Sequence, residues 1–197
     1  MLDVLPSRYF ELLEYDGSAD VLSTFEAAYH LAFDMAANDI KEKVAKQFVN
    51  VLKQGNGHTV RIYESKFFRP VILASLSPDD AVLVKQHLLG TMKSSIDLSL
   101  LRAVVGIEFV LTPGEIVKLV DSLVLAILNH RDERVGLAAR DCLERTWWNI
   151  RGEAEDRYMR RLNTWIQSLT EKGKTQQAAI LQEFKASIVP GEDDTPF

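Results

Sequence analysis

One segment of the 197-residue chain occurs twice, and this repeat constrains the fold more than any other feature. Leu76-Ser77-Pro78 corresponds to Leu111-Thr112-Pro113, 35 positions further on, and an acid follows each proline at Asp80 and Glu115. Serine and threonine are favoured N-cap residues, proline is favoured at the first helical position, and the acid complements the first turn. The sequence therefore predicts that a helix begins at each proline.

Apolar residues follow each proline at the spacing of one helical face. The equivalent sets are Ala81, Val84, Leu88 and Met92 in the first copy, and Ile116, Leu119, Leu123 and Ile127 in the second. The correspondence continues beyond the next turn, where Asp97, Leu100, Ala103 and Ile107 map onto Asp132, Val135, Ala138 and Cys142. A pair of helices is therefore predicted to repeat in register.

Weaker copies of this pattern flank the repeat. We expect further helices at about Arg8–Glu14, Asp20–Ala37, Asp39–Lys53, His58–Leu73, Glu153–Leu169 and Thr175–Ile188. The run Thr59–Tyr63 is rich in β-formers, but the residues after it continue more naturally as helix. The predicted fold is all-α, with one helical repeat domain over residues 1–188 and a disordered acidic tail over 189–197.

The helices are predicted to form antiparallel pairs, because the turns between them are short. Each apolar face is too wide for one neighbour to cover, so pairs stacked on pairs would bury it. This reasoning predicts a short α-solenoid. An irregular helical bundle with coincidental self-similarity is the alternative.

The segment from Asp132 to Leu143 resembles the second helix of a HEAT repeat, of the armadillo/HEAT type. That family favours Asp, then Val, a small residue and Leu at the spacing of Asp132, Val135, Ala138 and Leu143. The resemblance is best over Leu76–Trp147. It implies stacked helix pairs that present a curved face to another protein.

Composition limits the classes of partner. Lys and Arg number 23 and Asp and Glu number 28, so the net charge is −5, which disfavours a general nucleic-acid or anionic-membrane binder. Cys142 is the single cysteine, so an intrachain disulfide and a four-cysteine zinc site are excluded.

We find no signal-peptide pattern after Met1, and Leu119–Leu128 is too short to span a bilayer. A cytoplasmic protein is expected.

Two clusters of polar residues are candidate functional sites, and the first of them lies near the N-terminus. Glu26, His30 and Asp34 lie four residues apart on one helical face, a pattern that suits a divalent metal or a proton relay. We favour a solvated polar face here, and we predict no metal. Cys142 is predicted to be a small buried core residue, and His58, His87 and His130 to lie at helix ends or on polar faces.

Eight of the twelve arginines lie between Arg131 and Arg161, together with seven acids. The favoured interpretation is a salt-bridged helix face, with the pairs Asp141–Arg145, Glu153–Arg157 and Asp156–Arg160. A face that binds an acidic protein segment is the alternative, and an exposed Trp148 beside arginine would be a typical interface anchor. The residues predicted to contact a partner are Arg134, Arg140, Arg145, Trp148 and Arg151.

The leading functional hypothesis is a non-catalytic interaction module that binds an acidic or mixed-charge partner protein. No catalytic or nucleotide-binding motif is present, and no cofactor is predicted. One alternative is nucleic-acid binding or DNA-glycosylase-like activity on a HEAT-like scaffold, because Trp147, Trp148 and Trp165 accompany the arginines. Another is a helper or lyase subunit for a tetrapyrrole, which no particular residue supports.

Overall fold

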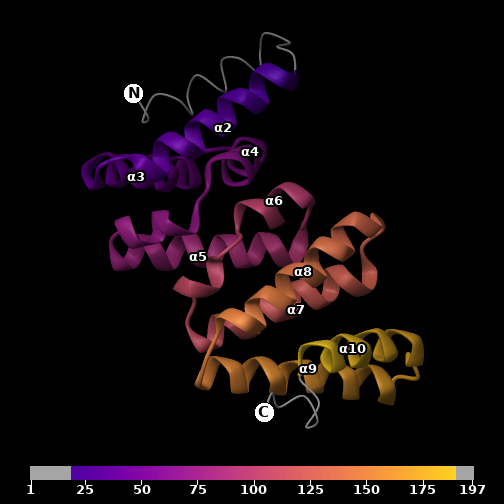
Figure 1. The fold of residues 1–197 in the computed structure, drawn as a ribbon. Helices are drawn as coiled ribbons and strands as arrows, with labels where there is room; N and C mark the ends of the chain where they lie inside the picture. Colours follow the sequence, from indigo (N-terminus) through magenta and orange to yellow (C-terminus); the bar gives the residue numbers. More distant parts are fainter. Residues whose placement is uncertain (1–18, 190–197) are drawn as a thin grey trace, which may run out of the picture. The chain divides into compact units, whose positions relative to one another are not determined.

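The protein is helical throughout the part of the chain that the structure describes (Figure 1). In this computed structural model the described residues are 19–189, with side chains described from residue 24, and no strand occurs among them. The all-α prediction is therefore confirmed for these residues. The predicted helix at Arg8–Glu14, and the predicted tail beyond Val189, lie outside the described residues.

The chain divides into two compact units. Unit 1 comprises residues 19–90 and 99–110, and unit 2 comprises 91–98 and 111–189. Unit 1 contains α2 (Ala19–Met35), α3 (Asn38–Gln54), α4 (Gly57–Phe67), the 3-10 helices η1 (Pro70–Ser75) and η2 (Ile107–Val110), and most of α5 (Pro78–Ser94) and α6 (Leu98–Ala103). Unit 2 contains α7 (Pro113–Asn129), α8 (Glu133–Asn149), α9 (Glu153–Glu171) and α10 (Thr175–Ile188).

The two helices predicted to begin at Pro78 and Pro113 are confirmed. Helices α5 and α7 each have 17 residues, and both of their ends are displaced by 35 positions. Thr112 and Glu115 form a capping box at the start of α7, and Ser77 Oγ accepts a hydrogen bond from the Asp80 amide at 3.3 Å. Both helices thus begin where the local cap chemistry places them.

The second helix of the repeat differs between the copies. Helix α8 has 17 residues, whereas α6 has 6 and ends at Ala103. Gly106, which corresponds to Asp141 of α8, has a φ of 88°. A right-handed helix cannot continue through that conformation, and glycine adopts it without steric cost. The prediction of a full second helix in the first copy is therefore wrong.

The helix predicted over His58–Leu73 is also interrupted. Helix α4 ends at Phe67, the backbone is extended at Phe68 and Arg69, and η1 begins at Pro70. Proline lacks an amide hydrogen and disfavours helical backbone in the residue before it. The helical interpretation of Thr59–Tyr63 is confirmed, because this run lies inside α4.

Aromatic side chains fill the core of unit 1. Tyr29 of α2 and Phe67 of α4 meet edge to face with ring centroids 5.0 Å apart, and Tyr29 also donates a hydrogen bond to the Phe67 carbonyl. Phe48 of α3 contacts Tyr63 and Phe68. Burial raises the pKa of the Tyr29 and Tyr63 hydroxyls well above the ordinary value of a tyrosine.

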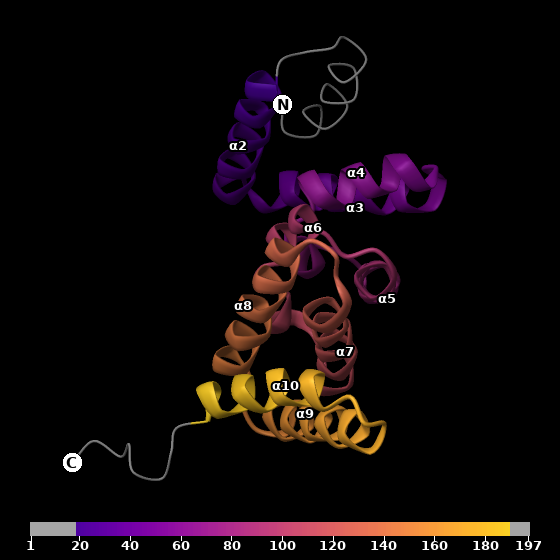
Figure 2. The same cartoon turned by 90° about the vertical axis from the view of Figure 1, so that its right-hand side faces the viewer.

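Unit 2 consists of two helical hairpins that pack side by side (Figure 2). Helix α7 packs against both α8 and α9, and α10 packs against α9. Helix α8 reaches α10 through Trp147, whose indole nitrogen donates to the Ile188 carbonyl at 3.0 Å. The first helices of the two hairpins, α7 and α9, thus pack on each other, and the second helices, α8 and α10, are also in contact.

Two glycines at the junction of α3 and α4, Gly55 at the end of α3 and Gly57 at the start of α4, differ in the space around them. A Cβ atom on Gly55 would lie 2.5 Å from the Val51 carbonyl oxygen, whereas one on Gly57 would meet nothing within 4 Å. We expect Gly55→Ala to lower the free energy of unfolding by about 1–2 kcal/mol. Gly57→Ala, inside α4, should leave it unchanged or raise it by up to about 1 kcal/mol. Urea unfolding of both variants checks this, and equal effects would contradict it.

Candidate functional site

Helix α8 exposes a mixed apolar and charged stripe, which we call the α8 outer face and define as Arg134, Leu137, Asp141, Arg145 and Trp148. Steps of three and four residues place these positions on one side of the helix. Leu137 is 56% exposed and Trp148 47% exposed. The opposite side is buried, with Val135, Ala139 and Leu143 facing the core. One face of α8 thus packs into the core of unit 2, and the opposite face is exposed to solvent.

The start of α8 is fixed by Asp132. Its carboxylate accepts a hydrogen bond from the Arg134 amide at 3.0 Å and two more from the Arg134 guanidinium, at 3.1 and 2.8 Å. These bonds hold the pKa of Asp132 below its ordinary value. Because the folded-state pKa is the lower one, this cap stabilises α8 at neutral pH, and its contribution is lost as the pH falls through that pKa.

Arg145 differs from Arg134 in its electrostatic surroundings. The predicted ion pair between Asp141 and Arg145 is not formed, and no other carboxylate of the described chain pairs with the Arg145 guanidinium. Arg145 therefore presents its charge to solvent one helical turn from the exposed indole of Trp148.

The five residues predicted to contact a partner do not all share this face. Arg134, Arg145 and Trp148 do. Arg140 lies over the ring of Phe184 in α10, and Arg151 donates to the carbonyls of Trp148 and Ile150 at the end of α8. The helical period alone places Arg140 about 120° around the helix from Arg134. The helical period can be applied to the sequence alone, and it also places Leu137 and Asp141 on the face of Arg134.

The remaining arginines mostly serve contacts inside unit 2. Arg157 pairs with Glu153 at 2.6 Å, as predicted. Arg160 bonds the backbone carbonyl of Asp156, so the predicted side-chain pair is not formed. The Arg161 guanidinium and the Trp165 indole both donate to the Asp121 carboxylate. The arginines predicted as one salt-bridged face are thus distributed over several separate contacts.

The cluster of Glu26, His30 and Asp34 faces the end of α4. Glu26 pairs with Lys66 at 3.1 Å, the His30 imidazole bonds the Lys66 carbonyl at 2.7 Å, and Asp34 pairs with Arg69 at 2.9 Å. The predicted solvated face is therefore corrected to a polar seam between α2 and the α4 end. Within residues 24–189, no three His, Cys, Asp or Glu residues are grouped so as to hold a metal ion.

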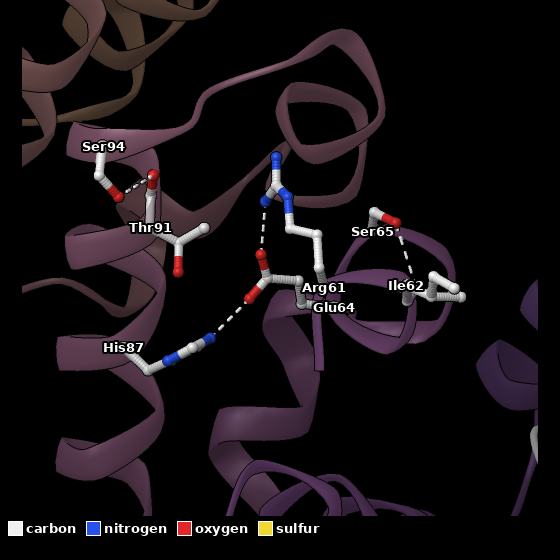
Figure 3. Close-up of polar contacts among 7 residues, drawn as sticks. All are labelled: Arg61, Ile62, Glu64, Ser65, His87, Thr91 and Ser94. Carbon is white, nitrogen blue, oxygen red and sulfur yellow. Dashed lines mark hydrogen bonds and ion pairs between the residues drawn. The ribbon is translucent and has the colours of Figure 1, made fainter. Parts of the chain in front are cut away.

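Unit 1 also contains a buried carboxylate that the sequence pattern did not single out (Figure 3). Glu64 of α4 is fully buried, and its two oxygens are met by Arg61 Nη1 at 2.5 Å and by His87 Nε2 of α5 at 2.7 Å. The triad joins α4 to α5. His87 thus links α5 to the buried carboxylate of α4.

The prediction that Cys142 is buried is wrong, because this residue of α8 is partly exposed.

No protein-family model, curated protein sequence or solved structure matches this chain. Among the helices of the described region, none is both long and apolar enough to cross a lipid bilayer.

Proposed function

We propose that this protein is a non-catalytic helical-repeat module whose α8 outer face binds a partner protein. The observation that carries the proposal is the exposure of Leu137 and Trp148 on the stripe that also displays Arg145. Tryptophan and arginine are the residue types that most often dominate interface energies, and large exposed apolar residues become favourable contacts when a partner excludes water.

The HEAT-like arrangement is part of the same proposal. It is supported by the displacement of 35 positions that relates α5 to α7 and the start of α6 to that of α8. It is also supported within unit 2, where one hairpin packs on the next. Hairpins stacked in a row leave the outer faces of their helices available to partners.

The charge of the face favours an acidic partner segment. Arg134 of this face is already paired with Asp132 at 2.8 Å, whereas Arg145 pairs with no carboxylate of the described residues and presents its positive charge to a partner. A carboxylate beside an apolar side chain would complement Arg145 and Trp148 together. Nucleic-acid binding is not proposed, because Arg134, Arg157 and Arg161 are already paired with carboxylates.

Affinity purification of the full chain from cells that express it naturally tests the proposal. The variant R145A/W148A should lose a partner that the wild type recovers. With the purified partner, the dissociation constant should rise by about thirtyfold or more, as is typical when a tryptophan anchor is removed. R160A, which changes an exposed arginine of α9, is the matched control and should bind normally.

The free energy of unfolding of R145A/W148A shows whether the variant has lost only the partner contact or its fold as well. Because Arg145 and Trp148 are exposed, the double variant should unfold within about 0.5 kcal/mol of the wild type. Partner recovery that is unchanged in R145A/W148A would contradict the proposed role of this face.

A further inference from the structure

A groove runs along η1 in unit 1, and we call it the η1 groove. It consists of two hollows of about 670 and 590 Å³ that share Lys41, Val71 and Ala74. Val71 and Ala74 belong to η1, and Lys41 comes from α3. Phe109 of η2 lines the second hollow. Since the hollows share three lining residues, they form one continuous surface.

One end of the η1 groove is apolar and exposed. Val71, Val105 and Phe109 are all exposed there, and Phe109 retains 69% of its accessible surface. The conformation of Gly106 ends the preceding helical turn, and a Cβ atom at Gly106 would lie 3.8 Å from the Phe109 ring. The ring of Phe109, three residues after this backbone break, thus lies at the surface.

The carboxylates that line the η1 groove are already paired. The ion pairs are Asp34–Arg69 at 2.9 Å, Glu42–Lys46 at 2.7 Å and Asp80–Lys53 at 2.8 Å. Neighbouring positive charge therefore balances each acid of the lining.

Lys41 is the exception among the charged residues of the lining. Its Nζ donates to the backbone carbonyl of Asp34 at 3.2 Å and lies 5.9 Å from the ring centroid of Phe33. No carboxylate among the described residues forms an ion pair with it. The centre of the groove therefore has one ammonium group that an incoming carboxylate can pair with, next to the apolar end.

We propose that the η1 groove binds a short acidic, amphipathic peptide segment of a partner protein. An aromatic or aliphatic side chain of the peptide packs on Val71, Val105 and Phe109, and an Asp or Glu carboxylate next to it pairs with Lys41. The charge of Lys41 selects the acid, and the exposed apolar residues supply the affinity. This site is separate from the α8 outer face and does not depend on the function proposed for it.

Binding of three synthetic peptides to the full chain tests this inference. The peptides share one amphipathic pattern of Leu and Phe, and differ only in having Glu, Gln or Lys at the polar positions. We expect the Glu peptide to bind about tenfold more tightly than the Gln peptide, and the Lys peptide more weakly still. Amide NMR shifts caused by the Glu peptide should centre on Lys41, Val71 and Phe109.

Variants separate the two parts of the site. K41Q should remove the preference for the Glu peptide, K41R should retain it, and K43Q, at an exposed lysine of the same helix outside the groove, should change nothing. F109S should weaken all three peptides by about fivefold to tenfold. Because Phe109 is exposed, that variant should keep its fold.

Three outcomes would overturn the inference. The first is equal binding of all three peptides to the wild type, and the second is no amide shift at millimolar peptide. The third is concentration-dependent self-association of the wild type that F109S abolishes, because the groove would then be occupied by a second copy of the chain.

Discussion

Replacement of Glu64 by alanine is expected to lower the free energy of unfolding by about 3 kcal/mol. The carboxylate is fully buried and receives Arg61 Nη1 and His87 Nε2. Its removal breaks the buried ion pair with the Arg61 guanidinium and the hydrogen bond that joins α4 to His87 of α5. Urea unfolding followed by far-UV circular dichroism measures the change.

A surface ion pair provides the control for the Glu64 prediction. Glu42 and Lys46 pair at 2.7 Å with both side chains more than half exposed. Glu42→Ala should therefore change the free energy of unfolding by less than about 0.5 kcal/mol. A loss at Glu64 as small as that at Glu42 would show that the buried triad does not stabilise unit 1.

Replacement of Asp121 by alanine is expected to cost about 2–3 kcal/mol. Its carboxylate accepts hydrogen bonds from Arg161 Nη2 at 2.8 Å and from Trp165 Nε1 at 2.6 Å, so it joins α7 to α9. The hydrogen bond to the Asp121 carboxylate raises the pKa of Arg161 above its ordinary value. Urea unfolding followed by tryptophan fluorescence is suited to this variant, because Trp165 is itself a partner.

The exposed pair of Glu153 and Arg157 is the control for Asp121. It lies within α9 and joins no second helix, so Glu153→Ala should change the free energy of unfolding by about 0.5 kcal/mol or less. If Asp121→Ala unfolds at the same urea concentration as Glu153→Ala, Asp121 does not hold α7 to α9.

Helix starts were predictable from the sequence because the signals that set them are local. Thr112, Pro113 and Glu115 lie within one turn and satisfy the first amide groups of α7 by themselves. The same type of signal was present at Pro70, where it ends α4, and at Gly106, where it ends the helical turn after α6. At both places the apolar periodicity continues, but the proline or the glycine interrupts the helix.

Contacts between distant residues were not predictable in the same way. Asp121 and Arg161 are 40 positions apart, and Glu64 and His87 are 23 apart. Which acid meets which base depends on how helices pack, and a single sequence contains no measure of that. The partners of Glu26, His30 and Asp34 were missed for the same reason, since Lys66 and the residues after it lie on another element.

The candidate site was predictable in part. Helical periodicity identifies Arg134, Arg145 and Trp148 as one face and places Arg140 on another side of α8. Arg151 lies beyond the last residue of α8, a boundary that helical periodicity alone does not give. The η1 groove has no sequence signal, because it depends on the two backbone breaks at Pro70 and Gly106.

Site-specific photocrosslinking in living cells tests the central claim, that the α8 outer face binds a partner, most directly. A photoreactive amino acid replaces Leu137 in the full chain, and the control replaces Gln182, an exposed residue of α10. The account predicts an adduct with one partner protein at position 137 that disappears when W148A is added, and none at 182. An identical adduct at both positions, or no adduct at 137, would contradict it.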